Sequence, residues 1–120
     1  MKTFFIKIND NKKKHEIYIQ KAIKLAEKST MLKKHGCIIV KNNKILGEGY
    51  NKRINTMKNM YSIHAEISAI QDAKKHLKDI KDSTLYVVRI NNENILDKSC
   101  PCIKCKNAIL SNNISKIYYS

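Results

Sequence analysis

Two short motifs in this sequence combine residue types that bind a metal ion. His64 and Glu66 lie two residues apart at the start of an apolar-periodic run, and Cys102 and Cys105 follow Pro101 far downstream. Nitrogen and sulfur ligands suit a borderline-soft divalent ion, so His64, Cys102 and Cys105 predict a Zn²⁺ site. Three protein ligands leave the fourth tetrahedral position for water, whose pKa zinc lowers to near neutrality. The pattern therefore predicts a source of hydroxide at physiological pH.

Glu66 is expected to act beside the metal rather than on it. Helical residues two positions apart do not face each other, so Glu66 is not placed to chelate the ion that His64 binds. Its carboxylate could take a proton from the water and return it to a ring nitrogen and then to a leaving amine. Hydrolytic deamination of an amino-substituted ring needs this combination. The alternative is that Glu66 is a first-turn acid that only stabilises the helix dipole.

The other cysteines leave a second interpretation of the metal site open. Cys100, Cys37 or His35 could supply a fourth protein ligand and close a structural zinc site. Otherwise Cys37 is expected as a buried thiol, and His35, which has no partner motif, as a surface residue. The chain has four cysteines, and in a reducing compartment a cluster of them is more often metal-binding than disulfide-bonded.

Hydrophobic periodicity and turn residues predict the elements that position these motifs. Residues 51–62 are expected as a loop, residues 91–99 as a polar excursion, and Asn42 and Asn43 as a hairpin turn. The expected helices span 15–29, 64–77 and 102–110, and the expected strands span 37–41, 44–49, 85–90 and 114–119.

This order of elements predicts an α/β fold with a mixed sheet and helices on both faces, that is, three α/β/α layers. The hairpin supplies an antiparallel edge. Ligands bind such sheets beyond the carboxyl ends of the strands, where helix N-termini point, and both motifs lie at helix N-termini. At 120 residues the chain is expected to form one domain, 1–120, with residues 1–14 as an N-terminal arm or extra strand.

Charge and composition limit the possible binding partners only loosely. There are 24 basic residues against 10 acidic ones, a formal charge of +14, which favours nucleic acid or a phosphorylated substrate. A background rich in Lys, Asn and Ile is the alternative explanation, since only Arg53 and Arg89 are arginines. The apolar stretch at 3–8 is interrupted by Lys7 and is too short for export or for a membrane span. A cytoplasmic location without membrane contact is therefore expected.

Taken together, His64-Ala65-Glu66 and Pro101-Cys102-x-x-Cys105 resemble the zinc deaminase signature of the cytidine and deoxycytidylate deaminase superfamily. The resemblance covers roughly residues 16–119. A histidine as the first ligand is more similar to the deoxycytidylate, tRNA-adenosine and polynucleotide branches than to the free-cytidine deaminases. The motifs therefore identify the superfamily without matching one branch cleanly.

The resemblance implies a cytidine-deaminase-like fold, a Zn²⁺ cofactor, ammonia release and Glu66 as the proton carrier. It also implies that Asn51 and Ala65 contact the substrate. Members of the superfamily usually continue past the fourth strand with a further helix and strand, so the sheet is expected to be shortened at the C-terminus. An exposed sheet edge is normally covered, here by residues 4–8 or by a partner subunit in a homo-oligomer.

We therefore predict a zinc-dependent deaminase whose substrate is cytosine in a nucleoside or nucleotide. One alternative is a deaminase of a base within nucleic acid, either adenosine in tRNA or cytosine in single-stranded DNA or RNA. Another is a non-catalytic, zinc-stabilised binding fold.

Overall fold

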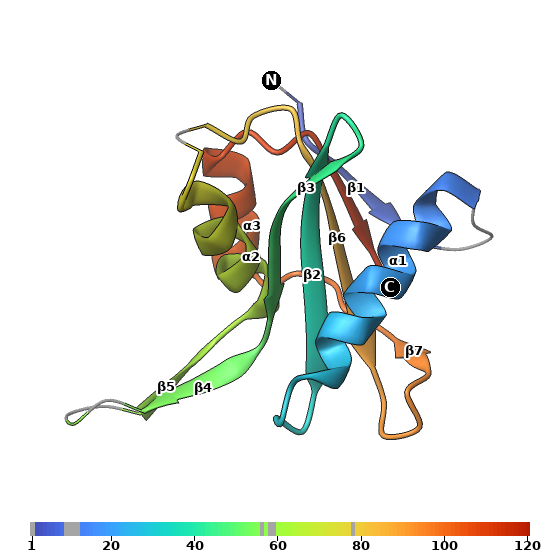
Figure 1. The fold of residues 1–120 in the computed structure, drawn as a ribbon, viewed down its shortest axis with the longest axis vertical. Helices are drawn as coiled ribbons and strands as arrows, with labels where there is room; N and C mark the ends of the chain where they lie inside the picture. Colours follow the sequence, from blue (N-terminus) through green and yellow to red (C-terminus); the bar gives the residue numbers. More distant parts are fainter. Residues whose placement is uncertain (1, 9–12, 56, 58–59, 78) are drawn as a thin grey trace.

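The computed structural model describes residues 2–8, 13–55, 57, 60–77 and 79–120 of the chain. A central sheet is covered by one helix on one face and by two helices on the other (Figure 1). The helices are α1 (Lys13–Glu27), α2 (Ala65–Lys74) and α3 (Ile103–Ser111). The strands are β1 (Phe4–Lys7), β2 (Lys34–Lys41), β3 (Lys44–Tyr50), β4 (Lys52–Asn55), β5 (Met60–Ile63), β6 (Thr84–Ile90), β7 (Leu96–Asp97) and β8 (Lys116–Tyr119).

The sheet has the order β1-β8-β6-β2-β3, and β7 pairs with β6 beside this path. Strands β1, β8 and β6 run parallel, whereas β2 is antiparallel to both β6 and β3. The predicted mixed sheet with three α/β/α layers is confirmed, as is the hairpin at its edge. Within the described residues, no helix is long and apolar enough to span a bilayer.

Strand β2 lies at the centre of the core because both of its faces are buried. Cys37 and Ile39 pack with α2 and α3 on one face, and Ile38 and Val40 pack with α1 on the other. A strand buried on both faces has a continuous apolar sequence, which explains why this strand was predicted from the run at 37–41. In the structure this strand begins earlier, at Lys34, so it also includes the polar residues Lys34 and His35.

The first strand closes the edge of the sheet beside β8. Phe4 pairs with Lys116 and Lys7 with Tyr119 in parallel register. The N–H of Phe4 donates to the carbonyl of Ser115 at 2.9 Å, and that of Ile8 donates to the carbonyl of Tyr119 at 2.7 Å. Residues 4–7 of the predicted 4–8 segment thus form a strand that covers β8, and β1 becomes the outer strand on this side of the sheet.

The prediction of a loop over 51–62 is wrong. Strands β4 and β5 form an antiparallel two-stranded ribbon, separate from the main sheet, that projects beyond it (Figure 1). The ribbon has no hydrophobic period because neither of its strands lies in the core. Similarly, the predicted polar excursion at 91–99 contains β7, whose two residues pair with Arg89 and Ile90.

Two helix starts are one residue later than predicted, and the hairpin turn is as expected. His64 and Cys102 are the N-caps of α2 and α3 rather than their first helical residues. Asn42 and Asn43 have φ of 51° and 63°, the left-handed conformation that a two-residue hairpin turn requires.

Strand β3 holds α2 close to the sheet through glycine. A Cβ atom on Gly49 would lie 2.5 Å from the amide nitrogen of Ala69 and 2.7 Å from the carbonyl oxygen of Ala65. No side chain fits in that space, so the backbone of α2 rests almost directly on β3. This contact fixes the N-terminal half of α2, which follows His64.

Candidate active site

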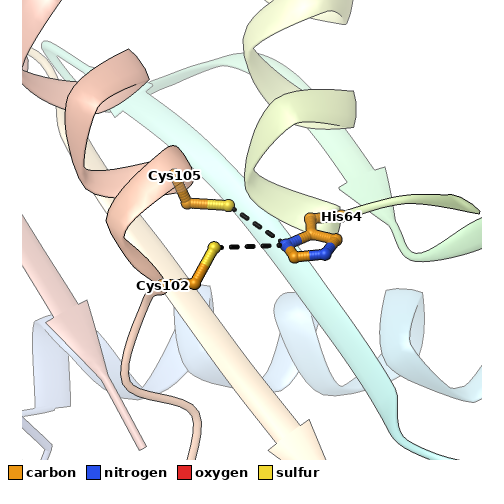
Figure 2. A group of neighbouring side chains, drawn as sticks. All are labelled: His64, Cys102 and Cys105. Carbon is orange, nitrogen blue, oxygen red and sulfur yellow. Dashed lines mark hydrogen bonds between the residues drawn. The ribbon is translucent and has the colours of Figure 1, made fainter.

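His64, Cys102 and Cys105 come together as a potential metal site, and their ligand atoms all lie within 4.8 Å of one another. The Nδ1 atom of His64 is 3.3 Å from Sγ of Cys105 and 3.6 Å from Sγ of Cys102 (Figure 2). Tetrahedral zinc with ordinary Zn–N and Zn–S bonds requires an N···S separation of about 3.6 Å. Both N···S separations are therefore close to those around a tetrahedral zinc ion.

Two helix N-termini position these ligands. His64 and Cys102 are N-caps with extended backbones, at φ −71°, ψ 152° and φ −73°, ψ 170°. Cys105 lies in the first turn of α3. Because unpaired N–H groups and the positive end of the dipole favour a nearby anion, both cysteines occupy positions that suit thiolates.

The electrostatics of the site also favour a cation. Burial raises the pKa of the Cys105 thiol, and the nearby Glu66 carboxylate raises it further. Burial likewise raises the pKa of Glu66, against the opposing effects of its backbone hydrogen bond, of the His64 charge and of a hydrogen bond to Cys105. Two potential anions share a buried location here, and a metal ion would stabilise both charged forms.

The metal cluster opens onto a cavity of about 450 Å³. Its wall is formed by residues 31–35, by the ribbon of β4 and β5, by the start of α2 and by residues 99–102. Glu66 lines this cavity although the residue is only 5% exposed, so its side chain lies between the core and the open space. A cavity of this size accommodates a small organic ligand.

Asn51 lines the cavity, but its side chain is also used to hold the wall together. Its Oδ1 accepts the N–H of His35 at 2.8 Å, and its Nδ2 donates to the carbonyl of Lys33 at 2.5 Å. The carbonyl of Asn51 accepts the hydroxyl of Ser29 at 2.8 Å. An amide has two further hydrogen-bonding positions, so these bonds leave a substrate contact available. That contact stays a prediction.

Ala65 is the first residue of α2 and lines the same cavity. The first N–H groups of a helix have no partner within it, so they can donate to a ligand. Ala65 as a whole is 1% exposed, so it is almost completely buried where it meets the cavity. Its predicted role toward the substrate is untested.

None of the suggested fourth ligands belongs to the metal cluster among the residues that the structure describes. Cys37 is fully buried in the core, as predicted. Cys100 and His35 line the cavity outside the cluster. The expectation of a surface position for His35 is wrong: it is half-buried, and burial, together with the charges of Arg89, His64 and Lys33, lowers its pKa.

Sequence reasoning missed several residues of the cavity wall. Lys33, Arg53 and Ser62 lie in segments without hydrophobic period, and no motif singles them out. The one sequence feature that could have drawn attention to Arg53 is that the chain contains only one other arginine, Arg89.

The sequence matches the family model described as the cytidine and deoxycytidylate deaminase zinc-binding region over residues 12–120. The chain belongs to this family. The match confirms the zinc cofactor and the superfamily predicted from the two motifs, and the family members that resemble this chain are named as deaminases.

Relatives within the deaminase family act on different bases, according to their names. The chain is 34% identical over 106 residues to a tRNA-specific adenosine deaminase of Streptococcus pyogenes, covering 85% of this chain and 59% of that protein. It is 32% identical over 111 residues to a diaminohydroxyphosphoribosylamino-pyrimidine deaminase of Buchnera aphidicola, covering 89% and 67%. The chain thus spans about three-fifths of the length of the tRNA deaminase.

Solved structures of deaminases share the fold. A dCMP deaminase of cyanophage S-TIM5, in complex with dCMP and dUMP, superposes with a TM-score of 0.72 at 22% identity, covering 92% of this chain and 83% of that one. The likeness confirms the cytidine-deaminase-like fold predicted from the resemblance.

Proposed function

We propose that this protein is a zinc-dependent hydrolytic deaminase of a nucleobase. The observation that carries the proposal is a cluster of three potential metal ligands, two of which line one cavity together with a buried carboxyl group. A closed structural site has no use for an adjoining cavity or for a buried acid. The non-catalytic binding fold is therefore the weaker interpretation.

His64, Cys102 and Cys105 would hold the zinc, which when bound supplies a Lewis acid that makes hydroxide available near neutral pH. Glu66 would accept a proton from water and donate it to a ring nitrogen of the base. It would then accept the proton of the hydroxyl group added to the ring carbon and pass it to the departing amine, which leaves as ammonia. Burial supports this role, because a carboxyl whose pKa is raised toward neutrality both accepts and releases protons readily.

Two further residues would orient the base. The N–H of Ala65, at the start of α2, would donate to a ring carbonyl or ring nitrogen. The remaining hydrogen-bonding positions of the Asn51 amide would contact the base or its sugar, while its other bonds hold residues 33–35 in place. Ala65 directly follows the ligand His64, and Asn51 directly follows β3, the strand on which α2 packs.

For the substrate we propose cytosine in a nucleoside or nucleotide. The support is the fold shared with a dCMP deaminase over 92% of the chain, together with a cavity of about 450 Å³ that suits a single nucleotide. Adenosine within tRNA is the second candidate. It is favoured by the 34% identity to a tRNA-specific adenosine deaminase and by the formal charge of +14.

Ammonia release from a substrate panel tests this proposal. The zinc-loaded protein is incubated with cytidine, deoxycytidylate, adenosine, guanine, tRNA and short single-stranded DNA. Release from deoxycytidylate or cytidine supports the first candidate, and release from tRNA alone supports the second. A cobalt-substituted protein whose spectrum shows four protein ligands and no exchangeable water would contradict both.

Assembly into a homo-oligomer and a cytoplasmic location stay predictions.

A further inference from the structure

The two arginines of the chain have different surroundings. Arg89 lies on β6, and its Nη2 atom is 3.7 Å from a carboxylate oxygen of Asp97 on β7. Arg53 lies on β4 and lines the cavity. Among the described residues it has no carboxylate within ion-pair distance. One arginine is thus used within the fold, and the other presents its charge to the cavity.

The ribbon of β4 and β5 holds Arg53 close to the metal ligands. Arg53 pairs directly with Ser62, so their side chains share one face of the ribbon, and both line the cavity. From Ser62, two residues of extended chain lead to His64. One inter-strand step and two extended residues place the Cα atoms of Arg53 and His64 at most about 12 Å apart. A nucleotide bound with its base at the metal would bring its phosphate into this range.

Away from the metal cluster, the charged residues described in the cavity wall are basic. Lys33 and Arg53 are exposed lining residues on two different segments, and no ion pair involves either of them among the described residues. Glu66 is the one acidic residue among the lining residues described, and it is buried beside the metal cluster. A ligand would therefore meet cations at the outer part of the cavity and a carboxyl group at its inner end.

We infer that Arg53, assisted by Lys33, binds a phosphate group of the substrate, an inference that rests on the proposed deamination. A guanidinium presents paired N–H donors that match phosphate oxygens, which a lysine cannot reproduce. The phosphate belongs either to a nucleoside monophosphate or to the backbone of a nucleic acid strand. In both cases Arg53 selects phosphorylated substrates over free bases and nucleosides.

Kinetics of variants at this position test the inference. For Arg53→Gln, we expect the ratio of kcat/KM for the phosphorylated substrate to kcat/KM for its nucleoside to fall roughly 10- to 100-fold, the value of a charge-assisted hydrogen bond. Arg53→Lys should recover only part of this ratio, because it restores the charge without the paired donors. Lys24→Gln removes an equal charge from an exposed site on α1 outside the cavity and should leave the ratio unchanged.

Comparing a nucleoside, its monophosphate and an oligonucleotide that contains it as substrates distinguishes the source of the phosphate. A larger effect on the monophosphate identifies a nucleotide, and a larger effect on the oligonucleotide identifies a nucleic acid strand; either supports the role of Arg53. An equal loss with phosphorylated substrate and nucleoside would overturn it.

Binding measurements separate this inference from the proposed function. The zinc-loaded protein is titrated by calorimetry with the four nucleoside monophosphates and with their nucleosides, which requires no turnover. Tighter binding of a monophosphate that is lost in Arg53→Gln supports the inference even if no ammonia is released. A short oligonucleotide is titrated in the same way, and absence of any preference for the monophosphates and the oligonucleotide over the nucleosides would overturn the inference even in an active deaminase.

Discussion

At the scale of single residues, the roles proposed for His64 and Glu66 differ because the two side chains point in different directions. His64 ends an extended segment and turns its Nδ1 toward the two thiols, whereas Glu66 lies in the first turn of α2 and is buried at the inner end of the cavity. One short motif thus offers both a potential metal ligand and a separate acid.

Replacing Cys105 should remove zinc from the protein. In Cys105→Ser the hydroxyl is a far poorer zinc ligand than a thiolate, so zinc affinity should fall by more than the roughly 10- to 100-fold cost of losing an outer-sphere partner. Metal content after dialysis, measured by mass spectrometry, gives the result. Cys100→Ser is the matched control and should keep its zinc, since Cys100 lies outside the cluster. Equal zinc loss in both variants would contradict the three-ligand site.

Glu66 should destabilise the metal-free protein at neutral pH. Burial raises its pKa in the folded state above the ordinary value of 4.5, so the folded protein retains a proton that the unfolded chain releases. The free energy of unfolding therefore falls as pH rises through this window. Glu66→Gln removes the cost, so the chelator-treated variant should be more stable than wild type at pH 7, with a difference that shrinks below about pH 4.

Urea denaturation of both metal-free proteins at the two pH values measures this difference. A wild type that is more stable than the variant at pH 7 would show that the Glu66 carboxylate is well solvated or paired.

At the scale of secondary structure, the site depends on how closely α2 approaches β3. Gly49→Ala should destabilise the protein by about 1–3 kcal/mol, because the new Cβ would overlap the backbone of Ala69 and Ala65. Glu48→Ala, on the exposed side of the same strand, should cost less than about 0.5 kcal/mol. Chemical denaturation measures both values, and equal stability of the two variants would mean that α2 is free to shift.

The elements that could be predicted from the sequence are those with a buried face. Strand β2 and helix α1 carry continuous or periodic apolar residues because they pack in the core, and both were found. None of the described residues of the β4–β5 ribbon belongs to either core cluster, so the pairing of Arg53 with Ser62 left no hydrophobic pattern. Only the folded structure shows that Arg53 and His35 line the cavity beside the metal cluster.

At the scale of the whole molecule, the first strand joins the beginning of the chain to its last strand. The general need to cover an edge predicted a role for residues 4–8, but neither their place beside β8 nor the parallel register could be read from Phe4–Lys7 alone. The pairing is long-range, and Phe5 contributes to the core between the sheet and α2 and α3. Loss of β1 should therefore expose an edge that can pair with another copy.

Proline substitutions in β1 test this pairing. The N–H groups of Phe4 and Ile8 point to β8, so by the alternation of the ladder that of Ile6 does too, whereas that of Lys7 points outward. Ile6→Pro should lower stability and promote association, because it removes a ladder hydrogen bond. Lys7→Pro should have a smaller effect. Thermal unfolding and analytical ultracentrifugation measure both, and similar behaviour of the two variants would contradict the register.

The most direct test of the account is ammonia release by zinc-loaded wild type and by zinc-loaded Glu66→Gln, with the zinc content of both samples measured. Glu66 lies outside the metal cluster, so both proteins should contain equal zinc. General acid–base catalysis contributes roughly 10²- to 10⁴-fold to rate, so the variant should lose at least about 100-fold in ammonia release on the best substrate of the panel. Equal rates at equal zinc content would contradict the assignment of proton transfer to Glu66.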